Sequence, residues 1–159
     1  MNKTNLSKIY KIIVSVMTIL GVIIYFYVFP AIGKSIIASY PEFSYRYNTW
    51  LIFVWATGIP CYAVLVNVWK IADNIGKDKA FTYETAGKFK RISQLAFFDS
   101  IFLVLGNILL LLANMNHPSV LILSFGISFV GVAIGVTALG LAYLTGNAAE
   151  LKEETDLTI

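Results

Sequence analysis

Four long apolar stretches with almost no charge dominate this 159-residue sequence. No charged residue lies between Lys11 and Lys34, and none lies between Asp99 and Glu150. A membrane-spanning helix needs about 20 consecutive apolar residues. We therefore expect four transmembrane helices, at about residues 12–29, 50–69, 92–113 and 120–144. The expected fold class is an all-α membrane protein whose four helices form a bundle.

The composition leaves little room for anything besides these spans. Hydrophobic residues make up 58% of the chain and charged residues 13%, against about 45–50% and 25% in soluble domains. The first apolar run exceeds the roughly 7–15 residues of a signal-peptide core, and no small-residue cleavage site precedes Pro30. We interpret it as a retained helix and residues 1–159 as one membrane domain, with no soluble catalytic domain.

The distribution of positive charge predicts the orientation. Of the 12 Lys and Arg residues, only Lys34 and Arg46 fall on one side of the predicted membrane, which leaves ten on the other. In membrane proteins, Lys and Arg are concentrated in the loops on the cytoplasmic side. Both termini, the loop at 70–91 and the tail at 147–159 should then be cytoplasmic, with residues 30–48 and 114–118 external. In the inner loop, Thr82 is a plausible N-cap with Glu84 in the first turn.

Asp99 is the most informative single residue, because a carboxyl group at a helix centre costs about 2.5–3.5 kcal/mol on insertion scales. Matching depths along the spans suggests that the hydroxyls of Tyr62, Thr18 and Thr137 surround it. Burial would favour its neutral form. Its role is either a proton or cation site or a hydrogen-bonded staple between helices. We favour the staple, since the spans hold no second charge.

The fourth span carries small residues at alternating spacings of four and three, which places them on one helical face. Such a face permits close approach of another helix. We favour packing within the monomer over dimerisation. The residues of this small-residue stripe are Ser124, Ser128, Gly131, Gly135, Ala138 and Ala142.

Catalysis finds no support in the sequence. The only histidine, His117, lies in a predicted external turn, so a metal site would lack partners. The single cysteine, Cys61, is expected to be an inert apolar core residue. No nucleophile, metal-protease or phosphate-loop pattern occurs. We expect no enzyme activity and no cofactor.

The tail differs from the rest of the chain, because acidic residues outnumber its one lysine. It should continue the fourth span as a helix and project from the anionic inner leaflet. It is either a solubilising end or a docking peptide for a basic cytosolic protein. The candidate partner-binding residues are Glu150, Leu151, Glu153, Glu154, Asp156, Leu157 and Ile159.

Short segments spread over essentially the whole chain carry a resemblance, at residues 33–43, 50–53, 59–62, 114–118 and 150–159. Together they resemble a family of small bacterial four-helix membrane proteins of unknown function. Members are often encoded beside a very small helix-turn-helix DNA-binding protein, which implies a membrane regulator paired with a transcription factor. The segment Thr82 to Lys88 departs from the family pattern, so the resemblance does not extend to a partner contact at this segment.

Three functions are therefore considered. The first is a regulatory protein that holds a small DNA-binding protein at the membrane through the inner loop and acidic tail, without binding nucleic acid itself. The second is a small oligomeric proton-coupled transporter that uses Asp99. The third is an immunity-type protein that protects the cell through its aromatic external loop, which holds Tyr40, Phe43, Tyr45 and Tyr47.

Overall fold

The computed structural model describes residues 2–157, apart from the side chains at positions 43, 156 and 157. This part of the chain is almost wholly helical. Four of its helical stretches are long and apolar enough to cross a membrane: Lys3–Ser39, Ser44–Gly76, Tyr83–Leu112 and Pro118–Thr155. The elements are α1 (Lys3–Ile23), the π-helical segment η1 (Ile24–Val28), α2 (Phe29–Ser39), the 3-10 segment η2 (Pro41–Arg46), α3 (Tyr47–Gly76), α4 (Tyr83–Leu112) and α5 (Pro118–Leu157).

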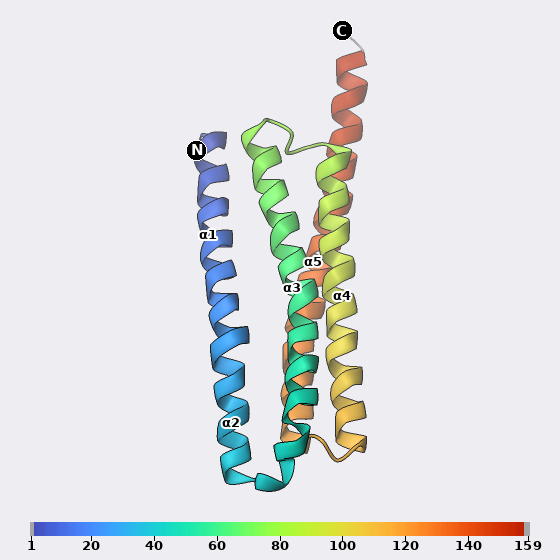
Figure 1. Cartoon of the computed structure of the whole chain (residues 1–159). Helices are drawn as coiled ribbons and strands as arrows, with labels where there is room; N and C mark the ends of the chain where they lie inside the picture. Colours follow the sequence, from blue (N-terminus) through green and yellow to red (C-terminus); the bar gives the residue numbers. More distant parts are fainter. Residues whose placement is uncertain (1, 158–159) are drawn as a thin grey trace.

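The long helices run side by side (Figure 1), and α1 begins at the end where α5 finishes. We call that end the terminal end, and we call the opposite end, which holds η2 and residues 113–117, the turn end. Helix α1 packs on α3, α3 on α4, and α4 on α5. Side chains of α3, α4 and α5 also meet in a small core at Ile71, Ile92 and Ala138. Helix α1 is thus the peripheral member of the bundle.

The outer surface of this bundle is apolar, and many of the residues buried between the helices are small or polar. Leu112 and Phe129 are 75% and 76% exposed, whereas Thr85, Ser93 and Ser124 are almost completely buried. This is the distribution expected when lipid covers the outside, because close packing by small residues, rather than burial of large apolar ones, holds membrane helices together.

The first helix does not end at Pro30, contrary to the sequence prediction. It continues to Ser39 through the π-helical segment. The N–H of Phe29 donates to the carbonyl of Ile24, five residues back. The next bond of that kind would run from residue 30 to Tyr25, but proline has no N–H. The indole Nε1–H of Trp55 in α3 donates to the Tyr25 carbonyl instead, at 3.0 Å. The segment predicted to be an external loop from Pro30 is therefore mostly helix.

Side-chain contacts fix the turns at both ends. Thr82 is the N-cap of α4, as predicted, and its hydroxyl accepts from the N–H of Thr85. At the turn end, α4 closes with Asn114 in the left-handed region, at φ 52°. Arg46 donates to the carbonyl oxygens of Ala113, at 2.8 Å, and Asn114. A cation is favourable there, since the C-terminus of a helix carries partial negative charge.

Candidate functional site

Asp99 lies in a short chain of polar side chains that joins three helical segments. Cys61 of α3 donates its thiol hydrogen to Asp99 Oδ2, at 3.5 Å. Tyr25 of η1 donates its hydroxyl to the Cys61 sulfur, at 3.8 Å. Asp99 is half-buried. Its second oxygen, Oδ1, is buried and accepts no hydrogen bond from the described residues.

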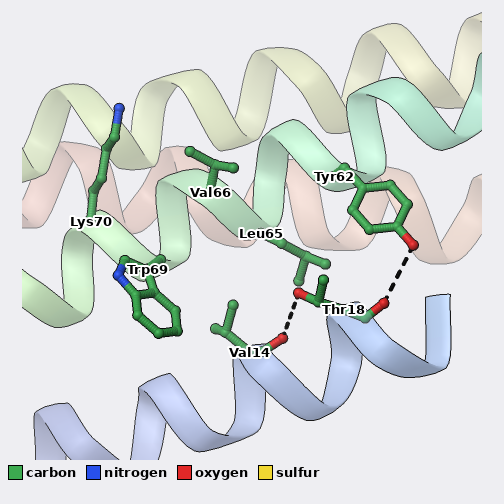
Figure 2. A pocket seen from close by; sticks show the side chains of 7 residues that line it. All are labelled: Val14, Thr18, Tyr62, Leu65, Val66, Trp69 and Lys70. Carbon is green, nitrogen blue, oxygen red and sulfur yellow. Dashed lines mark hydrogen bonds between the residues drawn. The ribbon is translucent and has the colours of Figure 1, made fainter. Parts of the chain in front are cut away.

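The hydroxyls predicted to surround Asp99 form hydrogen bonds elsewhere. Thr18 and Thr137 each donate to the carbonyl four residues earlier in their own helices, Val14 and Ala133, both at 2.8 Å. Figure 2 shows Tyr62 reaching from α3 to α1, where it donates to the Thr18 carbonyl at 3.4 Å. Val14, Thr18 and Tyr62 border a cavity of about 230 Å³ between α1 and α3, which Thr137 of α5 does not reach. Depth along the span was therefore insufficient to identify the partner of Asp99.

Cys61, and not Tyr62 as predicted, is the residue of α3 that donates a hydrogen bond to Asp99. It is exposed rather than buried in a core, so the prediction of an inert core residue was wrong. Consecutive residues of a helix point about 100° apart. For that reason Tyr62 faces α1 while its neighbour Cys61 faces Asp99. No motif in the sequence signalled the contributions of Tyr25 and Cys61.

The chemistry available at Asp99 is limited but specific. A thiol is a weak donor, so one sulfur contact compensates poorly for burying a carboxyl group. A buried oxygen that lacks a donor can accept a hydrogen bond from a bound proton carrier or ligand. The arrangement resembles an under-satisfied acidic site more than a staple built from strong hydrogen bonds.

The small-residue stripe of α5 faces α4. Ser124, Ser128, Gly135 and Ala138 are buried, and Gly131 and Ala142 are half-buried. The Ser128 hydroxyl donates to the Ser100 carbonyl across the interface, at 3.1 Å. A Cβ atom added at Gly135 would lie 3.1 Å from the Phe97 ring. The glycine therefore permits an approach that a larger residue would obstruct.

The tail is a straight continuation of α5. Thr145 and Ala149 are the last buried residues. Beyond them, every described side chain from 150 to 155 is exposed, including the candidate residues Glu150, Leu151, Glu153 and Glu154. Ile159 lies outside the described residues, as do the side chains of Asp156 and Leu157. Glu150, Glu153 and Glu154 lie on the side of the bundle that holds Tyr83, at the start of α4.

Comparison with known proteins agrees with this architecture. Residues 3–159 match the model of a family described as "Protein of unknown function (DUF2975)". The chain belongs to this family. It is also 29% identical, over 132 residues that cover 82% of each chain, to the uncharacterized membrane protein YoaS of Bacillus subtilis (strain 168). No solved structure matches it significantly. Together with the four spanning helices, this relative identifies a membrane-embedded protein.

Proposed function

We propose that this chain is a membrane anchor that captures a small basic cytoplasmic protein, of the helix-turn-helix DNA-binding kind, on the exposed end of α5. The observation that carries the proposal is the length of α5. Its 40 residues span about 60 Å at 1.5 Å per residue, whereas a bilayer with its headgroups is about 40–45 Å thick. Part of the helix must therefore stand clear of the lipid.

The charge of this extension suits a basic partner. Four acidic residues and one lysine lie between 150 and 157, which gives a net charge of −3 from four negative charges and one positive. Acidic side chains near a helix C-terminus are unfavourable, by about 0.3–1 kcal/mol each at low salt. A cationic protein would remove this repulsion on binding. DNA-binding domains present such a basic face to phosphates.

An apolar residue in the extension would lengthen the life of the complex. Leu151 is 64% exposed and has no core to join. Charge attraction speeds encounter, whereas contacts that exclude water slow dissociation. Exposed ion pairs alone contribute only about 0–1 kcal/mol each. We therefore expect binding to require both Leu151 and the glutamates.

Partner retention on washed membranes tests the proposal. Membranes carrying the full-length chain should retain a basic DNA-binding protein, identified by mass spectrometry, that is lost after deletion of residues 148–159. Combined substitution of Glu150, Glu153 and Glu154 by Gln should also release it, whereas Glu84→Gln, at an exposed position outside the extension, should not. Added duplex DNA should displace the partner if the extension occupies its DNA-binding face.

Two outcomes would reject this function. The first is that truncated and full-length chains retain the same proteins. The second is that duplex DNA leaves a retained partner in place. A transport function would depend on Asp99 instead. A self-protection function would depend on the aromatic segment at 40–47. Neither of these functions requires the extension of α5.

A further inference from the structure

A second cavity, of about 290 Å³, opens at the turn end of the bundle. Side chains of α2 line one side, those of α5 the other, and those of α3 and α4 lie between them. Helices α2 and α5 make no direct contact in the described chain, so the cavity is a groove between them. Nearly all of its wall is apolar, while Arg46 and His117 lie at its polar rim.

The depth of this groove matches one leaflet of a bilayer. Its wall on α3 extends from Tyr47 to Thr57, a distance of ten residues or about 15 Å at 1.5 Å per residue. The hydrocarbon core of a bilayer is about 30 Å thick, so half of it is the same length. Because the groove starts at Tyr47, the first residue of α3, we expect it to begin at the level of the headgroups and to finish near the bilayer centre.

Arg46 provides a cation at the expected headgroup level, and no carboxylate of the described side chains neutralises it. Its guanidinium donates to the neutral carbonyls of Ala113 and Asn114 and lies over the Tyr45 ring, at 4.5 Å from the centroid. Its Nε atom is buried and lacks an acceptor. Within the described residues Arg46 forms no ion pair, and no acidic residue lines the groove. A phosphate group is the usual partner of such a guanidinium.

We infer that the groove between α2 and α5 binds one acyl chain of a phospholipid, with the lipid phosphate held by Arg46. The apolar wall contacts the acyl chain, and the groove is as long as one leaflet of the hydrocarbon core is thick. The unneutralised guanidinium selects a lipid that carries a phosphate. With the orientation predicted from the positive charges, the lipid comes from the outer leaflet. This site is at the opposite end of the bundle from the extension of α5 and does not depend on the proposed docking function.

The test is lipid binding to the purified full-length protein in detergent, measured by native mass spectrometry. Phosphatidylglycerol is compared with diacylglycerol of the same acyl chains, which lacks only the headgroup. We expect one phosphatidylglycerol per chain, with affinity at least about tenfold above that of diacylglycerol, the ratio expected from one charged hydrogen bond. Arg46→Gln should remove this difference, whereas Lys34→Gln, which changes the other external cation, should retain it.

A second pair of variants tests the acyl site without touching Arg46, whose loss could also loosen the end of α4. Leu123 lines the groove and its neighbour Ile122 does not, although both are more than 60% exposed. Leu123→Trp should abolish binding of both lipids, and Ile122→Trp should leave it unchanged. Equal affinity for the two lipids, or undiminished binding by Leu123→Trp, would overturn the inference. It would also be overturned if the groove were occupied by a second copy, seen as a lipid-free dimer that Leu123→Trp dissociates.

Discussion

Asp99 and Asn107 lie eight residues apart on α4 and illustrate how differently one helix can accommodate polar side chains. The Asn107 amide donates to the Leu103 carbonyl at 2.9 Å, and its oxygen accepts from Asn116 at 2.6 Å. Among the described residues, the Asp99 carboxyl has only the Cys61 thiol as a donor, and its Oδ1 atom has none. Hydrogen bonding therefore stabilises Asn107 more strongly than Asp99, which makes Asp99 a candidate for function rather than for structure.

At the scale of residues, we predict that Asp99→Leu changes the free energy of unfolding by less than about 0.5 kcal/mol, because the one donor that it leaves without an acceptor is the weak thiol of Cys61. Asn107→Leu leaves Asn116 without its acceptor, so it should lower the free energy of unfolding by about 1–2 kcal/mol. Thermal unfolding in detergent measures both. A loss at Asp99 as large as that at Asn107 would instead identify Asp99 as a staple.

At the scale of elements, the π-helical segment η1 depends on a donor from a different helix. Trp55→Phe keeps the ring that packs on Phe26, whose centroid is 5.7 Å away, but removes the donor to the Tyr25 carbonyl. Trp55→Phe should lower the free energy of unfolding by about 1–2 kcal/mol, the penalty for a carbonyl that loses its donor in apolar surroundings. Pro30→Ala restores a backbone N–H next to this carbonyl. Trp55→Phe should therefore cost less in a Pro30→Ala background.

A double-mutant cycle in detergent measures this coupling. An interaction energy above about 0.5 kcal/mol between positions 30 and 55 is expected for residues that serve one acceptor. Strict additivity would mean that the indole does not replace the missing proline N–H.

At the scale of the whole molecule, both ends of the described chain lie at one end of the bundle (Figure 1), as four spans require. Cysteine labelling in a Cys61→Ser background, which keeps a donor toward Asp99, tests which side of the membrane this is. Tyr45→Cys should react with an impermeant reagent in intact cells. Lys77→Cys and Thr155→Cys should react only after permeabilisation. The opposite pattern would reverse the orientation predicted from the ten-to-two distribution of positive charge.

The spanning helices were predictable because hydrophobic runs and charge report directly on the bilayer. The stripe from Ser124 to Ala142 was also readable, since spacings of four and three define one face of a helix. The end of the first helix was not predictable, because the helix continues past Pro30 where Trp55, 25 residues away in sequence, provides a compensating donor. The partner of Asp99 depended on helix rotation, which depth along a span does not determine.

The order of packing in the bundle has a consequence for how the protein is made. Each spanning helix contacts chiefly the one synthesised just before it, because α3 packs on α1, α4 on α3, and α5 on α4. Contacts between sequence neighbours carry a small loop-closure cost and favour fast folding. When a helix inserts, the helix on which it packs is therefore already in the bilayer. Assembly can follow synthesis one helix at a time, and α5, the last of the four spanning helices described, carries the exposed acidic end.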